Sequence, residues 1–145
     1  MGRFELSVTI NRPPEEVWSV LTDVEKTATW SAPAVEEHWT TPGPVGIGSR
    51  RVATAQMMGR RTQNEAEVTE LEPNRKWTMK SVSGPPFEVS ATFQAVEGGT
   101  RVDWTWSFAF SGLLKLVEPI VVAVFKRQFA KDLQQLKLLM ETGAL

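Results

Sequence analysis

The sequence contains no cysteine, no tyrosine and a single histidine, His38. The absence of cysteine excludes disulfides, thiolate nucleophiles and cysteine metal sites. The absence of tyrosine leaves an aromatic set of six Trp and seven Phe, which has no phenol to donate a proton. One histidine cannot form a metal site alone, and the acidic residues are scattered along the chain. We therefore predict no metal and no other cofactor.

The chain also lacks an apolar run long enough to cross a bilayer. Its most apolar stretch, residues 113–125, contains Lys115, Glu118 and Pro119, and it falls short of the roughly 20 residues that a spanning helix needs. We expect this stretch to form a buried helix, without stable membrane insertion. Residues 1–6 lack the apolar core of a signal peptide, so we expect a cytoplasmic protein.

Neither charge sign is in clear excess. The 16 basic and 17 acidic residues give a net charge of -1, which argues against a general affinity for nucleic acid or anionic membranes, although local basic pairs could still matter. The length of 145 residues fits one domain, residues 1–145, with one core. Either a monomer or a homodimer is compatible with this sequence.

Apolar and polar residues alternate along several segments, as half-buried strands require. Residues 3–10 follow this pattern. The cleanest example is 100–110, where five large side chains share one face: Val102, Trp104, Trp106, Phe108 and Phe110. The other predicted strands are 35–41, a pair joined at Gly59 whose second member covers 62–71, and then 75–82 and 87–96.

Two regions have helical signals. Pro14, Glu15 and Glu16 suit the first turn of a helix, and Asp23 could cap a second short helix that ends near Trp30. The C-terminal region has an apolar stripe at intervals of three or four: Val122, Phe125, Phe129, Leu133, Leu136 and Met140. Polar residues, Asp132 among them, lie between these and are expected to face solvent. Pro119 predicts a kink or a new helix start after a turn over 113–117.

This order of elements, together with five short motifs, resembles the SRPBCC superfamily and in particular its polyketide cyclase/dehydrase-like members. The motifs are INRPPEEVW (10–18), LTDVE (21–25), GIGS (46–49), VTELEP (68–73) and GGTRV (98–102). The resemblance implies an α+β START-like helix-grip fold, in which a curved seven-stranded antiparallel sheet wraps around the long C-terminal helix and two short helices follow strand one. It also implies an internal tunnel for lipids, polyketides, sterols or aromatic metabolites. Such motifs are structural and say little about the substrate.

Two adjacent arginines, Arg50 and Arg51, follow the turn at 42–48, and strand alternation directs one of them inward. If Val52 faces the interior, Arg50 and Gln56 do so too, and a cation and an amide are then available to bind a ligand carboxylate or carbonyl. In the alternative arrangement Arg51 faces inward, or the strand ends are exposed to solvent.

The predicted ligand-binding set combines inward-facing aromatic residues with a few polar ones: Trp30, Arg50, Gln56, Met58, Asn64, Trp77, Phe87, Trp104, Trp106, Phe125 and Phe129. The tryptophans either line the cavity or fill it. His38 is expected to be a surface residue, and Glu65 and Glu67 are expected to pair with arginines outside.

Our first hypothesis is a binder of a small hydrophobic ligand such as a lipid, a polyketide or an aromatic metabolite. The alternative is a polyketide cyclase/dehydratase-like enzyme in which Arg50 holds an enolate oxygen. The lack of tyrosine weakens the enzyme hypothesis, and no catalytic residue is assigned. A protein-interaction module, the third hypothesis, finds no support in an exposed apolar run.

Overall fold

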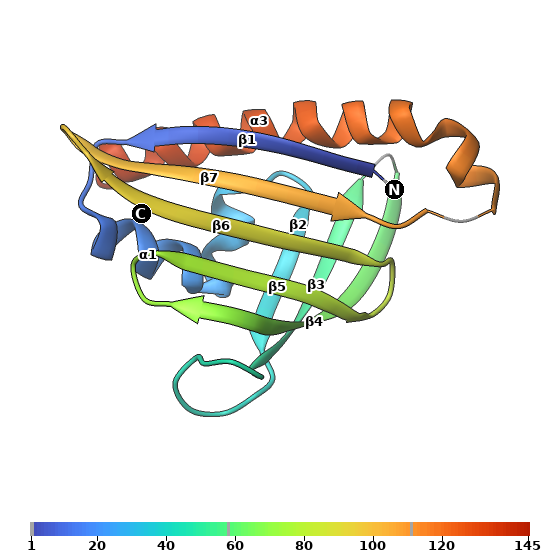
Figure 1. Ribbon diagram of the computed structural model, residues 1–145, viewed down its shortest axis with the longest axis horizontal. Helices are drawn as coiled ribbons and strands as arrows, with labels where there is room; N and C mark the ends of the chain where they lie inside the picture. The colour runs from blue at the N-terminus through green and yellow to red at the C-terminus, as the bar shows by residue number, and fades with distance from the viewer. Residues whose placement is uncertain (1, 58, 111) are drawn as a thin grey trace.

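The computed structural model describes residues 2–57, 59–110 and 112–145. These residues form one antiparallel sheet of seven strands in the order β1-β7-β6-β5-β4-β3-β2 (Figure 1). The strands are β1 (Gly2–Ile10), β2 (Ala34–Trp39), β3 (Arg50–Met57), β4 (Arg60–Glu72), β5 (Lys76–Ser83), β6 (Phe87–Val96) and β7 (Gly99–Phe108). All predicted strands are present, with ends shifted by a few residues.

Helices lie between β1 and β2 and at the C-terminal end of the chain. The first group comprises α1 (Pro14–Thr22), the 3-10 helix η1 (Val24–Lys26) and α2 (Thr27–Trp30). The long helix α3 (Glu118–Glu141) follows the 3-10 helix η2 (Gly112–Val117) and runs alongside β1 (Figure 1). This arrangement confirms the predicted α+β helix-grip fold.

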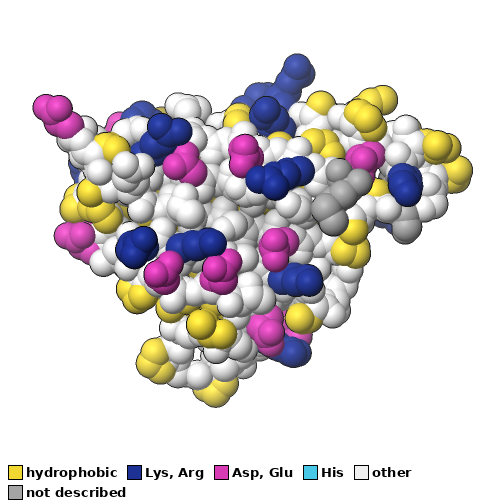
Figure 2. Space-filling view, in the orientation of Figure 1, with side chains coloured by type: hydrophobic (Ala, Val, Ile, Leu, Met, Phe, Trp, Pro, Cys, Tyr) yellow, Lys and Arg dark blue, Asp and Glu magenta, His cyan; other side chains and the backbone are white. Residues whose placement is uncertain are grey.

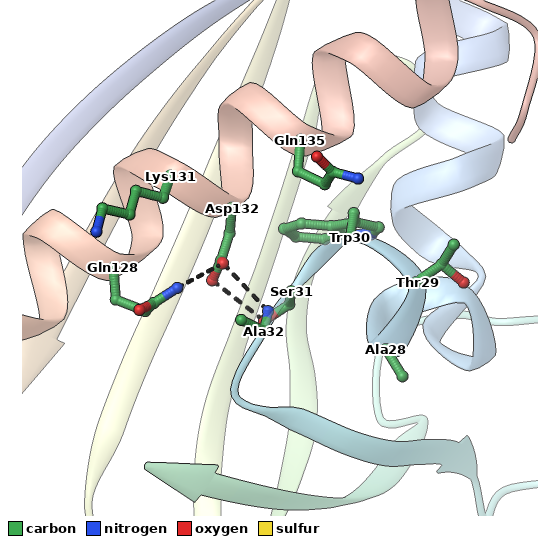
Figure 3. A pocket seen from close by; sticks show the side chains of 9 residues that line it. All are labelled: Ala28, Thr29, Trp30, Ser31, Ala32, Gln128, Lys131, Asp132 and Gln135. Atoms are coloured by element: carbon green, nitrogen blue, oxygen red, sulfur yellow. Dashed lines mark hydrogen bonds between the residues drawn. The ribbon is translucent and has the colours of Figure 1, made fainter. Parts of the chain in front are cut away.

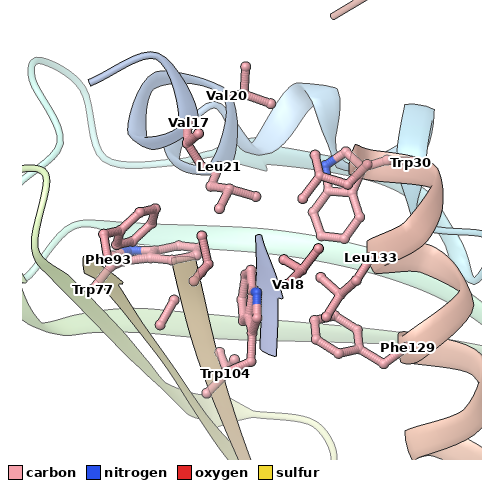
Figure 4. Packing of buried hydrophobic residues seen from close by; sticks show 14 of the residues in the cluster. Val8, Val17, Val20, Leu21, Trp30, Trp77, Phe93, Trp104, Phe129 and Leu133 are labelled. Carbon is pink, nitrogen blue, oxygen red and sulfur yellow. The ribbon is translucent and has the colours of Figure 1, made fainter. Parts of the chain in front are cut away.

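The core lies between the sheet and α3, with α1 and α2 closing one end (Figure 4). The predicted stripe of α3 faces inward: Phe129, Leu133, Leu136 and Met140 are buried, and Val122 and Phe125 are half-buried. Opposite this stripe, β7 buries Val102, Trp104 and Phe108. The two periodicities seen in the sequence therefore meet across the core.

The start of the C-terminal helical region departs from the prediction. Residues 113–125 were expected to be buried, yet Leu113, Leu116 and Ile120 have exposed fractions of 84%, 80% and 66%. The expectation is wrong because the sheet ends before this segment does, so η2 and the first turn of α3 extend past it (Figure 1). Pro119 lies in the first turn of α3, where a missing N–H costs nothing, so the predicted new helix start is confirmed.

None of the helices formed by the described residues combines the length and apolar character needed to cross a bilayer.

Two polar residues differ from their predicted roles. The side chain of Asp23 makes no capping hydrogen bond to η1. Asp132, expected in solvent, is buried because it accepts hydrogen bonds from the segment that joins α2 to β2.

Candidate functional site

The inward-facing arginine on β3 is Arg51. Arg51 lies opposite Ala66 of β4 in the sheet register, and Ala66 is fully buried. Because residues paired across strands project to the same face, Arg51 also projects inward. Of the arrangements that the sequence left open, the structure therefore shows the one in which Arg51 faces inward. Arg50, which the predicted ligand-binding set had placed inside, lies on the outer face. There it pairs with Glu65 at 3.1 Å and with Glu67 at 3.2 Å, which confirms the role expected for these two acids.

The same strand alternation decides on which face of the sheet the other polar candidates lie. Gln56 belongs to the row of Arg50, is exposed, and accepts a hydrogen bond from Arg61 at 3.4 Å, so its predicted inward position is also wrong. Asn64 lies opposite the buried Ala53 and faces inward as predicted. Met58, the remaining candidate on these strands, lies outside the described residues.

Arg51 forms a buried ion pair with Glu37 of β2. Its Nε lies 3.2 Å from Oε1 of Glu37, and the two side chains are only 6% and 11% exposed. Nη1 of Arg51 donates a hydrogen bond to Oδ1 of Asn64 at 2.9 Å, and Thr27 hydrogen-bonds Glu37. The Nε–H group of Arg51 is not aligned as a hydrogen bond to any acceptor in the described part of the chain. The pair is thus buried but incompletely satisfied.

Burial perturbs the pKa of both charged groups. Desolvation raises the pKa of Glu37 above its ordinary value, while the charge of Arg51 and the hydrogen bond from Thr27 lower it in part. Desolvation likewise lowers the pKa of Arg51, and the Glu37 charge opposes this effect. Burial disfavours a charged form that is taken out of water. Perturbed groups of this kind concentrate at functional sites.

A continuous path of aromatic side chains leads from this ion pair to the middle of α3 and to α2. The Arg51 guanidinium lies 5.7 Å from the ring centre of Phe87, which lies 5.7 Å from that of Trp106. The ring centre of Phe129 lies 5.5 Å from that of Trp106, 5.1 Å from that of Trp104 and 6.4 Å from that of Trp30. Figure 4 shows the last three rings grouped together. Most of the predicted aromatic site residues therefore form one layer.

Two further predicted residues lie beside this layer. Phe125 contacts Phe108 at 5.0 Å and is half-buried near the start of α3. Trp77 is buried on β5 but lies towards α1, as the diagonal cross-strand neighbour of Phe93 (Figure 4). Trp77 thus belongs to the same core but to a different part of it.

The interior is rich in hydrogen-bond donors. The buried indole N–H groups of Trp30, Trp77, Trp104 and Trp106 donate to no acceptor among the described residues. Indole offers a donor and no acceptor, and buried donors usually have a partner. Together with Arg51, these groups give the interior an excess of donors over acceptors.

A pocket of about 350 Å³ opens to solvent between α2 and α3, and Trp30 is among its lining residues (Figure 3). Asp132 organises it by accepting hydrogen bonds from Ala32 N at 3.1 Å, Ser31 Oγ at 3.3 Å and Gln128 Nε2 at 3.0 Å. Because Trp30 also contacts Trp104 and Phe129, its indole separates this pocket from the aromatic layer.

A second pocket of about 360 Å³ lies among residues of β5, β6 and β7, including Lys76, Thr92 and Asp103. It also opens to solvent. Neither pocket is the predicted tunnel between sheet and helix, where the aromatic rings contact one another.

Glu37 is the main site residue that sequence reasoning missed. Glu37 shares strand alternation with Trp39, which is half-buried, so the pattern of β2 held a signal for its inward position. His38 is exposed, as expected. Across the described ranges no three His, Asp or Glu side chains come together as metal ligands would.

Comparisons with known proteins agree with this fold. A solved structure of a Thermus thermophilus protein has a TM-score of 0.81 at 19% identity and covers 93% of this chain and 94% of that chain. The Zhui aromatase/cyclase of Streptomyces sp. R1128 has a TM-score of 0.72 at 16% identity, covering 92% of this chain and 89% of that chain. At such identities the likeness shows the fold alone.

An uncharacterized protein of Mycobacterium tuberculosis is 27% identical over 114 residues, which is 75% of this chain and 66% of that protein. The chain thus aligns with about two thirds of the length of this relative. The family model described as "Polyketide cyclase / dehydrase and lipid transport" matches residues 1–141. As the sequence resemblance predicted, the chain belongs to the polyketide cyclase/dehydrase and lipid transport family.

Proposed function

We propose that this protein binds a small hydrophobic molecule bearing several oxygen acceptors, held between the inner face of the sheet and α3, with Arg51 as its polar anchor. The observation that carries the proposal is the donor-rich aromatic interior, in which a buried guanidinium lies next to Phe87. An apolar wall with a few placed polar groups is the usual composition of a small-molecule site.

The hydrogen-bond donors of the interior indicate which class of ligand it can bind. Carbonyl, enolate and carboxylate oxygens accept hydrogen bonds from indole N–H and guanidinium groups, and a ligand with several such oxygens would satisfy donors that are otherwise unpaired. A pure hydrocarbon would leave them unpaired. Polyketides and oxygenated aromatic molecules fit this requirement, in keeping with the family to which the chain belongs.

Binding requires the aromatic layer to open. Ring centres 5.0 to 6.5 Å apart are in contact, so a ligand must displace at least one ring. Phe87, Trp106 and Phe125 are half-buried, whereas Trp30, Trp104 and Phe129 are buried, so the aromatic layer is already partly open to solvent at the three half-buried rings. We place the entrance there, next to Arg51.

The test compares an oxygen-rich aromatic probe, the hydroxyanthraquinone emodin, with the hydrocarbon anthracene by quenching of tryptophan fluorescence. Since Arg51→Met alone leaves Glu37 buried without its partner, the variant is the double substitution Glu37→Met/Arg51→Met. Its matched control is Glu67→Met/Arg50→Met, which removes an ion pair from the outer face of the sheet, between β3 and β4.

We expect saturable binding of emodin that weakens about tenfold in the inner double variant, as loss of a hydrogen bond to a charged group predicts. The outer control and the binding of anthracene should stay unchanged. Failure of wild-type protein to bind emodin would contradict the proposal. Equal weakening in both double variants would contradict the role of Arg51.

A second candidate function is a cyclase or dehydratase activity on such a ligand. Glu37 favours it, because an inward carboxyl group with a raised pKa holds a proton to higher pH than an ordinary carboxyl group, while the adjacent cation stabilises an enolate. Conversion of a poly-β-ketone thioester by wild-type protein, lost in Glu37→Gln although ligand binding is retained, would support this activity. Equal product yields with and without protein would exclude it for this substrate.

A further inference from the structure

Large apolar side chains gather on the end of the molecule where η2 leads into α3. Leu113, Leu116 and Ile120 are mostly exposed there, and Val117 and Val124 are exposed to 41% and 37%. Figure 2 shows hydrophobic side chains at this end of the molecule, with a Lys or Arg side chain among them. We call these five residues the apolar tip. The tip contradicts the expectation from sequence that no exposed apolar run exists.

The charge around the tip is opposite to that of the remaining chain. Residues 112–131 contain four basic residues and one acid, and these are Lys115, Lys126, Arg127, Lys131 and Glu118. This segment has a formal charge of +3 within a chain of net charge -1, so the remaining residues sum to -4.

Two of these basic residues, Arg127 and Lys131, share a face of α3 with two residues of the tip. Ile120, Val124, Arg127 and Lys131 follow one another at helical spacings of three and four, and all four are exposed. Residues at these spacings share one face of a helix. This outward face of α3 is therefore apolar over its first two turns and cationic over the next two.

We propose that the apolar tip docks this protein reversibly on an anionic membrane surface. Exposed leucine and isoleucine side chains enter the boundary between headgroups and acyl chains, and the basic residues contact the anionic headgroups, which is the division of roles in interfacial helices. The partner is a surface: the tip protrudes past the end of the sheet (Figure 1), so it is convex and suits a fluid layer better than a preformed groove.

A second copy of the chain is a poorer occupant for the tip. In a symmetric dimer the same patch lies on both partners, so two segments of charge +3 would face each other and repel. The docking also differs from transmembrane insertion, because only a few side chains of η2 and α3 would enter the lipid.

The position of the tip links the docking to the proposed ligand site. Phe125 and Val122, on the inward side of the same turns of α3, are half-buried and pack against the core beside the aromatic layer. Docking through the tip therefore brings the proposed entrance close to the lipid. The docking itself does not depend on the proposed ligand, and it is tested without one.

The experiment is co-sedimentation of the full chain with phosphatidylcholine vesicles that contain either no anionic lipid or about 30% phosphatidylglycerol. The test variant is Leu113→Glu/Leu116→Glu. Its control is Leu138→Glu, which places the same charge on an exposed leucine, 57% accessible, near the other end of α3. Circular dichroism checks that all three proteins are folded. We expect both variants to fold, because the substituted leucines are exposed and contribute little to the core.

We expect wild-type protein and Leu138→Glu to sediment with the anionic vesicles only, and to be released by about 0.5 M NaCl. The partition coefficient of Leu113→Glu/Leu116→Glu should fall by on the order of a hundredfold, because burial of each exposed leucine is worth about tenfold. Absence of wild-type binding would overturn the proposal. So would equal binding of the double variant. A concentration-dependent dimer that the double variant abolishes, without vesicle binding, would assign the tip to a second copy instead.

Discussion

Replacing Arg51 with methionine tests whether the ion pair between Arg51 and Glu37 is shielded from solvent. The substitution keeps most of the apolar side-chain volume but removes the charge that lies 3.2 Å from Glu37. Removing one partner of a buried pair leaves the other charge uncompensated, which costs about 3–5 kcal/mol. A domain of this size is typically stable by about 5–15 kcal/mol. The single variant should therefore lose a large part of its free energy of unfolding.

Two further variants separate charge burial from simple loss of a side chain. Glu37→Met/Arg51→Met removes both charges, so it should recover most of the lost stability, because hydrophobic replacement of a whole buried pair is often neutral or stabilising. Arg50→Met should have a much smaller effect, since the pairs of Arg50 with Glu65 and Glu67 are solvent-exposed and screened.

The loss of unfolding free energy in Arg51→Met should also depend on pH, and its direction follows from the pKa of Glu37. The folded-state pKa of Glu37 is raised above 4.5, mainly by desolvation, and Arg51 opposes this shift. A carboxyl group with a raised folded pKa binds a proton more tightly in the folded chain, so stability falls as pH rises from 4.5 through the folded pKa. Without Arg51 this pKa rises further. The difference between wild type and Arg51→Met should thus be smaller at about pH 5 than at about pH 8.

Urea denaturation followed by tryptophan fluorescence measures these differences for all four proteins. We expect Arg51→Met to be far less stable than Arg50→Met, the double variant to recover, and the gap to widen with pH. Equal midpoints for Arg50→Met and Arg51→Met would refute the burial of the pair. A pH-independent gap would refute the assignment of the effect to Glu37.

Three more outcomes follow from packing. Gly99→Ala should destabilise by about 1–3 kcal/mol, because a Cβ there would lie 2.1 Å from the carbonyl oxygen of Ile10, whereas Gly46→Ala, with open space around it, should not; urea midpoints decide, and equal midpoints contradict the clash. Trp30→Ala should cost about 3–5 kcal/mol and join the pocket beside α2 to the aromatic layer, so a second route should open and emodin should bind faster in stopped-flow quenching; an unchanged rate would show that the pocket and the layer stay separate. Phe129→Ala should cost a similar amount, about 3–5 kcal/mol, since four aromatic rings contact Phe129; a loss below about 1 kcal/mol would mean that the layer is loosely packed.

Periodicity made most of the fold predictable. Val102, Trp104 and Phe108 of the alternating strand and the helical stripe from Phe129 to Met140 proved to be buried, because repeats of 2 and 3.6 residues are local properties of strand and helix backbones. Turn signals worked for the same reason. Gly59 has a φ of +76° between β3 and β4, a conformation that glycine adopts without strain.

The candidate site was predictable only in part. Alternation required one of Arg50 and Arg51 to face inward, but it contained no information on which one. That choice depended on the sheet register, which places Arg51 opposite Ala66. The aromatic residues were easier to identify, since large apolar side chains on an inward row have few other places to go.

The sequence by itself determined which segments became strands and helices and which of their faces are apolar, because those properties follow from neighbouring residues. The tertiary structure alone decided three other matters: that Arg51 pairs with Glu37 inside, that Asp132 is buried against the α2–β2 link, and that Leu113 and Leu116 remain exposed. Each depends on what a distant segment covers or leaves uncovered. The sheet reaches over one part of the C-terminal helical region and ends before another, and no local pattern records where that limit lies.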